Sequence, residues 1–309
     1  MKIITVTLSP AIDIHCSTDS FTAERENFAK ITSRDAGGKG INISRALLAC
    51  GIKNTALVAV GDKNADGLLA SLSSDGLDCE AIWTQGLIRE NITVHTIGAK
   101  ETRLSFDGFC GDSALLEEVE QYLCENIKKG DIVALAGSIP SGVDIESVKA
   151  VVLRLKSLGA DVIVDSRSFK PNDITECKPF LIKPNEEEII AYIGAEISSV
   201  EDAVKAAISI YNKGIENVMI SLGSLGAVLA CADGAFFANA PKIEAISTIG
   251  AGDSSIAGFI SAYKDNKSAC ECLKTAVAYG SAACVTEGTK PPRKEDTEKF
   301  IAEIKIKRF

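Results

Sequence analysis

Short runs of Val, Ile, Leu and Ala alternate along the chain with segments in which apolar residues recur every three or four positions. The short runs are typical of buried strands, and the second spacing is typical of helices with one buried face. The predicted strands are residues 1–8, 55–60, 79–83, 131–136, 161–165, 180–183 and 217–221. The predicted helices are residues 65–75, 113–128, 144–158, 185–193 and 200–213, and residues 252–304 are predicted to be mainly helical.

Nearly continuous apolar strands that alternate with helices indicate a parallel sheet that is covered on both faces. The expected fold class is α/β, with a doubly wound, mostly parallel sheet, helices on both of its faces, and residues 1–309 in a single domain. Two segments interrupt this rhythm, near residues 9–36 and 89–108. The second contains alternating stretches joined by a turn at 98–100, which is typical of a hairpin. We expect both segments to form a small β lid over one end of the sheet.

A glycine-rich turn, Thr248-Ile249-Gly250-Ala251-Gly252-Asp253, leads directly into a predicted helix. Gly250 and Gly252 permit unusual backbone angles and leave room for a ligand beside the main chain. The first amide groups of a helix lack intrahelical partners and lie at its positive end, so the turn predicts an anion site. Asp253 within this site has two interpretations: a base that accepts the proton of an attacking hydroxyl, or a simple helix cap.

A second glycine-rich turn, Gly37-Gly38-Lys39-Gly40-Ile41-Asn42, opens another predicted helix, with Lys39 and Asn42 at its mouth. In parallel sheets, ligands bind at the carboxyl ends of the strands. Polar and glycine-rich stretches follow the predicted strands there, at 137–140, 183–185 and 221–226. A lysine in one turn and an aspartate in the other suggest a kinase that holds two phosphorylated molecules head to head. The sequence has no G-x-x-x-x-G-K-[ST] motif, which argues against a P-loop enzyme.

These motifs resemble the two defining patterns of the ribokinase/PfkB carbohydrate kinase family, Gly-Gly-Lys-Gly-x-Asn at 37–42 and Thr-x-Gly-Ala-Gly-Asp at 248–253. The similarity runs nearly end to end. Thr7-Leu8-Ser9-Pro10-Ala11-Ile12-Asp13 resembles the phosphosugar branch, which contains 1-phosphofructokinase and tagatose-6-phosphate kinase. The resemblance implies a ribokinase-like fold and ATP-dependent phosphorylation of a ketohexose monophosphate. It favours fructose 1-phosphate, with fructose 1,6-bisphosphate as the product, over tagatose 6-phosphate.

The resemblance also implies roles for individual residues. Asp253 would be the base, and the amides of Gly250, Ala251 and Gly252 would stabilise charge on the transferred phosphoryl group. The implied substrate-binding residues are Asp13, Gly38, Lys39, Asn42, Arg89, Asn91, Ser138 and Asp253, with Lys39 and Arg89 on the phosphate of the sugar. The implied ATP-binding residues are Lys183, Asn185, Ser221, Gly223, Gly226, Thr248, Gly250 and Gly252. Asn185 and Glu188, spaced as N-x-x-E, would organise Mg²⁺, mostly through water.

Some positions depart from the phosphosugar branch. Ser9 replaces its usual asparagine, and Thr93 stands where lysine is frequent. A kinase of unphosphorylated sugars is one alternative, against which Arg89 argues. A catalytically silent sugar-phosphate sensor is another. Lys39, Lys183 and Glu188 have the simpler interpretation of surface charges. A Rossmann dehydrogenase is disfavoured because no G-x-G-x-x-G turn follows the first strand.

Composition narrows the set of partners. The net charge is −9 and no run of lysines or arginines forms a stripe, so nucleic acids and anionic membranes are not expected partners. No apolar run reaches the roughly 18 residues needed to cross a bilayer, and the first residues lack the features of a signal peptide, which predicts a cytoplasmic protein. The ten cysteines form no C-x-x-C pair, and only His15 and His95 are histidines. The expected partners are a sugar phosphate and ATP, and the resemblance implies a homodimer through the lid strands.

Overall fold

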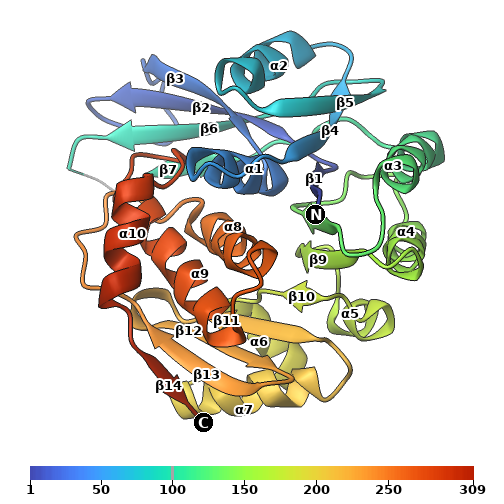
Figure 1. Cartoon of the computed structure of the whole chain (residues 1–309). Helices are drawn as coiled ribbons and strands as arrows, with labels where there is room; N and C mark the ends of the chain where they lie inside the picture. Colours follow the sequence, from blue (N-terminus) through green and yellow to red (C-terminus); the bar gives the residue numbers. More distant parts are fainter. Residues whose placement is uncertain (99–100) are drawn as a thin grey trace.

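The larger sheet of the protein provides the platform for the ligand-binding loops. The computed structural model describes residues 1–98 and 101–309, so residues 99 and 100 of the predicted turn lie outside the described residues. The strands of this sheet follow the order β14-β13-β12-β11-β10-β9-β8-β1-β4-β5 (Figure 1). Their bounds are β1 (Ile3–Thr7), β4 (Thr55–Gly61), β5 (Asp78–Thr84), β8 (Ile132–Ala136), β9 (Asp161–Asp165), β10 (Leu181–Ile182), β11 (Asn217–Ser221), β12 (Gly226–Cys231), β13 (Gly234–Asn239) and β14 (Ile306–Arg308).

Strands β5 to β11 of this order are all parallel, whereas β12, β13 and β14 add antiparallel pairings at one edge. β1 lies between β4 and β8, so the chain winds away from β1 in both directions. The carboxyl ends of the parallel strands therefore lie along one edge of the sheet, where open α/β sheets bind ligands.

Helices cover both faces of this sheet and enclose two apolar cores. One face is covered by α1 (Lys39–Ala49), α8 (Ala251–Lys264), α9 (Ala269–Cys284) and α10 (Lys294–Glu303). The other is covered by α2 (Ala65–Ser74), α3 (Ser113–Asn126), α4 (Ile145–Ser157), α5 (Pro171–Cys177), α6 (Glu186–Ile193) and α7 (Val200–Tyr211). The predicted fold class, a mostly parallel α/β sheet with helices on both faces, is confirmed. Among the described residues, every helix is too short or too polar to cross a bilayer.

A second, smaller sheet is built from the two segments that interrupt the sequence pattern. Its order is β3-β2-β6-β7, with β2 (Ala11–Thr18), β3 (Lys30–Gly37), β6 (Arg89–Thr96) and β7 (Thr102–Leu104). β2 and β6 pair in parallel, which places Asp13 opposite Asn91. β2 and β3 pair in an antiparallel arrangement that returns the chain to the start of α1. We call this sheet the lid.

The sequence pattern predicted most of the elements but made no prediction for α5, the β12–β13 hairpin or β14. β12 is buried along its whole length and β13 along half of it, so these strands lack a clean alternation of polar and apolar residues. β14 has three residues and pairs only at the edge of the sheet. α5 begins at a proline, which suits the first turn of a helix. The helix is too short for its apolar residues to show a helical period.

Helices α8 and α9 pack closely at Gly258. A Cβ atom on Gly258 would lie 2.6 Å from the carbonyl oxygen of Thr275 and 2.9 Å from Cβ of Tyr279. Both neighbours belong to α9 and are fixed by its backbone. The contact therefore requires glycine, and it sets how deeply α8 lies against α9.

We predict that Gly258→Ala destabilises the fold by about 1–3 kcal/mol, because an added methyl group would overpack this contact. Gly67→Ala, within α2, is the matched control, since a Cβ atom there meets nothing within 4 Å. The control should raise the stability by about 0.5–1 kcal/mol, as alanine is the better helix former. Urea denaturation of both variants would measure this. A Gly258→Ala variant as stable as the control would contradict the predicted close contact.

Candidate active site

The amino-terminal end of α1 is pressed against the end of β1 and the start of the lid. Gly38 precedes α1 with φ 136°, a backbone conformation that favours glycine. A Cβ atom on Gly38 would lie 2.7 Å from Cγ2 of Thr7, and one on Gly40 would lie 2.8 Å from the carbonyl oxygen of Val6. At Gly37 a Cβ atom would collide with the carboxylate of Asp13. The glycines of this motif thus allow α1 to begin beside both β1 and the lid.

The amino-terminal ends of α1 and α8 meet at one hydrogen bond. Nδ2 of Asn42, on α1, donates to Oδ2 of Asp253, on α8, over 2.8 Å. Gly250 precedes α8 with φ 76°, in the left-handed region. Asp253 is only 7% exposed. The two glycine-rich turns, which are far apart in sequence, therefore open toward a common point with a carboxylate between them.

Two lysines and a second carboxylate surround this point. Nζ of Lys39 lies 3.0 Å from Oδ2 of Asp165, the last residue of β9. Lys183, after β10, is 6% exposed. Its Nζ lies 2.9 Å from the place where a Cβ atom on Gly252 would be, so it contacts the turn before Asp253. The interpretation of Lys183 as a surface charge is wrong, because its side chain is buried.

The buried charges shift one another's pKa values. Burial, together with the nearby negative charge of Asp165, raises the pKa of Asp253, although Asn42, Lys39 and Lys183 oppose this. Burial would also raise the pKa of Asp165, but Lys183 and Lys39 outweigh it and lower that pKa. Burial disfavours the charged form of Lys39, yet Asp165 and Asp253 outweigh it and raise its pKa. Asp253 is thus the more basic of the two carboxylates.

The lid contributes a polar group of residues beside this point. Nδ2 of Asn91 donates to Oδ1 of Asp13 over 2.9 Å. The guanidinium of Arg89 donates to the carbonyl oxygens of Ser9 and Pro10, over 3.2 and 3.3 Å. Within residues 1–98 and 101–309, no carboxylate forms an ion pair with Arg89.

Three buried oxygen atoms near these residues have no hydrogen-bond partner among the described residues. They are Oγ1 of Thr7, Oδ1 of Asn42 and Oδ1 of Asn91. Buried polar atoms are normally paired, and amide oxygens accept hydrogen bonds. Two of the three therefore suit a ligand that carries hydroxyl donors. Ser138, after β8, is exposed, and the neighbouring Gly137 lies close to Lys39.

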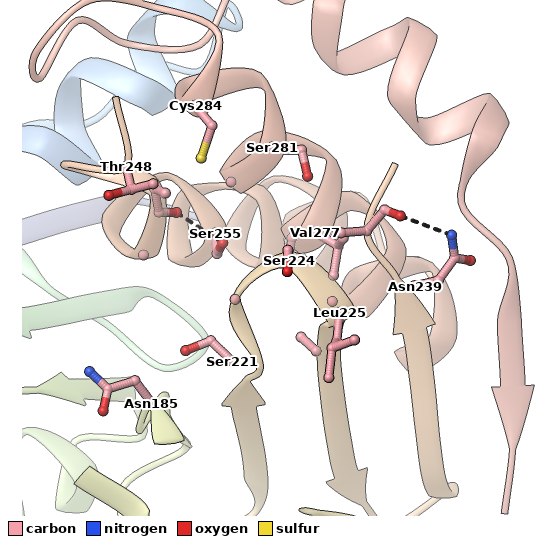
Figure 2. A pocket seen from close by; sticks show the side chains of 18 of the residues that line it. Asn185, Ser221, Ser224, Leu225, Asn239, Thr248, Ser255, Val277, Ser281 and Cys284 are labelled. Carbon is pink, nitrogen blue, oxygen red and sulfur yellow. Dashed lines mark hydrogen bonds between the residues drawn. The ribbon is translucent and has the colours of Figure 1, made fainter. Parts of the chain in front are cut away.

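A cavity of about 980 Å³ lies on the other side of Asp253, between β11, the β12–β13 hairpin, α8 and α9. Most of the predicted nucleotide-binding residues line it: Lys183, Asn185, Ser221, Gly223, Gly226, Thr248 and Gly252. Gly250 is not among the lining residues, but the adjacent Ala251 is. Figure 2 shows Asn185 and Ser221 on one side of this cavity and Thr248, Ser281 and Cys284 on the other.

Sequence reasoning missed the apolar wall of this cavity. The wall includes Leu225, Phe237, Ile243, Ala276 and Val277, of which Leu225 and Val277 are labelled in Figure 2. These residues come from η1 (Gly223–Leu225), the β12–β13 hairpin, the loop after it and α9. Leu225 lies within the predicted stretch 221–226, but the other four belong to no motif, and only Ala276 and Val277 carried a signal, the run of small residues along α9. A flat, aromatic ligand such as a purine base suits an apolar wall of this kind.

A comparison with known proteins settles the family. A model of the pfkB family of carbohydrate kinases matches residues 4–296. The chain belongs to this family. The 1-phosphofructokinase of Bacillus subtilis (strain 168) is 32% identical over 310 residues, which cover 99% of this chain and 100% of that protein. The ATP-dependent 6-phosphofructokinase isozyme 2 of Escherichia coli (strain K12) is 28% identical over 305 residues, which cover 98% of each chain.

Solved structures agree with this assignment. The crystal structure of phosphofructokinase-2 from Escherichia coli in complex with substrates and products matches with a TM-score of 0.91 and 28% identity. The match covers 98% of this chain and 99% of that chain. The pfkB protein described here is therefore an enzyme, a kinase with the ribokinase-like α/β fold that the sequence motifs implied.

Asn185 and Glu188 of this kinase form a capping box at the start of α6. Oδ1 of Asn185 accepts from the amide of Glu188 over 2.8 Å, and Oε2 of Glu188 accepts from the amide of Asn185 over 3.1 Å. Oε1 of Glu188 pairs with Arg167 over 3.0 Å. Across the described parts of the chain, no group of three or more His, Cys, Asp or Glu side chains could hold a metal. The carboxylate and amide oxygens of Glu188 and Asn185 are of the ligand type that suits Mg²⁺, which usually keeps several of its waters.

The raised pKa of Asp253 has a consequence for stability. A group whose pKa is higher in the folded than in the unfolded protein stabilises the fold below its unfolded pKa, and loses this contribution as the pH rises through its folded pKa. We therefore predict that Asp253→Asn unfolds at a higher urea concentration than the wild type at pH 8. The difference should shrink as the pH falls toward 3.8, the ordinary pKa of aspartate. A variant less stable than the wild type at pH 8 would contradict the assigned direction of the pKa shift.

Proposed function

We propose that this kinase transfers the γ-phosphoryl group of ATP, with Mg²⁺, to a ketohexose monophosphate. The proposed acceptor is fructose 1-phosphate, and the product is fructose 1,6-bisphosphate. The observation that carries the proposal is the 2.8 Å bond between Asn42 and Asp253, which joins two helix ends that are each suited to an anion. The choice of acceptor is supported by the name of the Bacillus subtilis relative, 1-phosphofructokinase.

In this proposal Asp253 accepts the proton of the attacking sugar hydroxyl. Its raised pKa makes the carboxylate a stronger base than an ordinary aspartate. The amides of Gly250, Ala251 and Gly252 face the charge that develops on the transferred phosphoryl group. Lys183, in contact with the same turn, adds positive charge there. Position and charge, more than covalent chemistry, accelerate phosphoryl transfer.

The sugar phosphate is assigned to the space between the lid and α1. Asp13, Asn42 and Asn91 would hold its hydroxyls, with the unpaired amide oxygens of the two asparagines as acceptors. Gly38 and Ser138 would border the sugar. Arg89 would bind the phosphate that the sugar already carries, since guanidinium matches phosphate geometry. Lys39, the second cation expected for that phosphate, is paired with Asp165 in this structure.

ATP is assigned to the 980 Å³ cavity, with its phosphates toward Lys183 and Thr248 and its base against the apolar wall. Ser221, Gly223 and Gly226 would border the nucleotide. Mg²⁺ would bind to the phosphates and would reach Asn185 and Glu188 through water, where it would neutralise charge on the phosphates. The capping box holds both side chains in fixed orientations for this role.

We also propose that the protein is cytoplasmic and that it forms a homodimer through the lid. The lid and the loops beside it expose apolar side chains, including Phe28 at 81% and Ile97 at 79% of their surface. Strand edges and apolar patches of this kind are usually covered by another chain. Analytical ultracentrifugation of the wild type and of a Phe28→Asp variant would test it. A wild type that stays monomeric at micromolar concentration would overturn it.

The acceptor is tested with a panel of sugars and MgATP in a coupled assay of ADP release. We expect the highest kcat/KM with fructose 1-phosphate, lower values with tagatose 6-phosphate and fructose 6-phosphate, and the lowest with fructose. The panel includes two other sugar phosphates because each is an alternative acceptor. The motifs suggest tagatose 6-phosphate, and the name of the Escherichia coli relative suggests fructose 6-phosphate. A preference for either would overturn the acceptor, and activity confined to unphosphorylated fructose would overturn Arg89 as a phosphate ligand. No turnover with any sugar would favour a sensor.

The Arg89→Ala variant in the same panel tests the phosphate contact. We expect its KM for fructose 1-phosphate to rise about tenfold or more, because a charge-assisted hydrogen bond contributes about 1.5–3 kcal/mol. The KM for ATP should stay unchanged. Arg154→Ala, on the exposed side of α4, is the control and should leave both KM values as they are. Equal increases in both KM values would show that Arg89 does not bind the sugar phosphate.

For the base we predict that Asp253→Asn lowers kcat by about 10²–10⁴, the usual contribution of general base catalysis. The side chain keeps its shape, so calorimetry should still detect binding of the nucleotide and of the sugar phosphate. Turnover near the wild-type value would refute the role of Asp253. Loss of binding together with turnover would show a structural role instead.

A further inference from the structure

One buried charge in the site has no role in the function proposed above. Asp165 ends β9, is 5% exposed, and directs Oδ2 to Nζ of Lys39 over 3.0 Å. Its main chain is tied to the neighbouring strand, because the amide of Gly137 donates to the carbonyl oxygen of Asp165 over 3.0 Å. Charged side chains are seldom buried to this degree without a strong reason. The carboxylate is therefore fixed by both its strand and its partner.

The position of Lys39 follows from this pairing. Among the charges that act on Asp165, Lys183 has the largest effect and Lys39 the next. Lys183 itself contacts Gly252, in the turn that precedes Asp253. Both lysines therefore lie around one carboxylate, on the side of the site where the phosphoryl group would be transferred. The pairing holds the Lys39 ammonium beside Asp165, where the charge of Asp253 also acts on it.

We propose that Asp165 is a positioning residue, which holds the Lys39 ammonium beside the transferred phosphoryl group. The proposal rests on the proposed function, because it assigns a place to the transferred group. Lys39 then acts with Lys183 on the charge of the transition state, and Arg89 is the cation for the distal phosphate of the sugar. In this arrangement the lid binds the phosphate that the sugar already carries, through Arg89. At the edge of the larger sheet, Lys39 and Lys183 lie beside the transferred phosphoryl group.

The charge of Asp165 has a second effect, on the base. Two carboxylates and two lysines balance one another in this buried cluster, and the negative charge of Asp165 helps to raise the pKa of Asp253. Replacing Asp165 with a neutral side chain of the same shape would leave Asp253 beside two lysines without a competing carboxylate. The ionised form of Asp253 would then be favoured, and its pKa would fall.

The test compares Asp165→Asn with Asp161→Asn. Asp161 begins the same strand at its opposite end, where its carboxylate accepts from the hydroxyl of Tyr263 over 2.9 Å. For Asp165→Asn we expect kcat with fructose 1-phosphate to fall at least tenfold and KM to change less than threefold. The acid limb of the kcat/KM profile should move to lower pH, because Asp253 becomes less basic. Asp161→Asn should keep the wild-type kcat, KM and acid limb.

Other outcomes would overturn the proposal. A KM that rises as much as kcat falls would place Lys39 on the distal phosphate of the sugar. A lower kcat with an unmoved acid limb would reduce Asp165 to a structural role, since a purely structural defect does not change the basicity of Asp253. A fall in kcat of Asp161→Asn equal to that of Asp165→Asn would trace the effect to the strand and not to the charge.

A stability cycle without substrate separates this proposal from the proposed function. Lys39→Met should lower the urea midpoint because it leaves the buried carboxylate of Asp165 without its partner. Asp165→Asn should lower it because it removes the negative charge beside Lys39 and beside the buried Lys183. The double variant should lose less than the sum of the two single losses, which is the signature of directly coupled residues. Additive losses would overturn the pair. A coupled pair in an enzyme that phosphorylates no sugar phosphate would overturn the proposed function, and with it the kinetic role of Asp165, but not the pair itself.

Discussion

The hydrogen bond between Asn42 and Asp253 is the constraint on which the site depends. It joins the first turns of α1 and α8, which belong to motifs at opposite ends of the chain. For the bond to form, α1 must begin directly at the end of β1, and only glycines allow so close an approach there. α8 must in turn lie deep against α9, which the contact at Gly258 permits. The packing of the helices thereby places a carboxylate between two helix ends that attract anions.

The second constraint is the balance of charge around that carboxylate. A carboxylate between two anion sites would repel both ligands if it stood alone. Lys39 and Lys183 offset its charge, and Asp165 in turn pairs with Lys39. Because Asp253, Asp165 and Lys183 are buried, their interactions are stronger than they would be in water. The same burial raises the pKa of Asp253, so it strengthens the charge interactions of the site and also makes Asp253 a stronger base.

The sequence allowed the parallel core of the sheet and both glycine turns to be predicted, because each leaves a local pattern of apolar residues or glycines. Within the site, most of the residues that it predicted for the nucleotide do line the cavity, since they follow strands at one edge. It did not indicate the apolar wall from the β12–β13 hairpin and α9, whose residues differ little from ordinary core residues. It also missed the Lys39–Asp165 pair, in which the two residues are 126 positions apart and only the fold brings them together. Long-range contacts of this kind leave no local signal.

The central claim is that the two helix ends hold the two phosphorylated ligands with Asp253 between them. A crystal structure with fructose 1-phosphate, Mg²⁺ and a non-hydrolysable ATP analogue measures this most directly. The account predicts a sugar hydroxyl within hydrogen-bond distance of the Asp253 carboxylate, and the terminal phosphate of the analogue against the amides of residues 250–252. A sugar hydroxyl group that points away from Asp253, or a nucleotide bound outside the cavity beside α9, would contradict it.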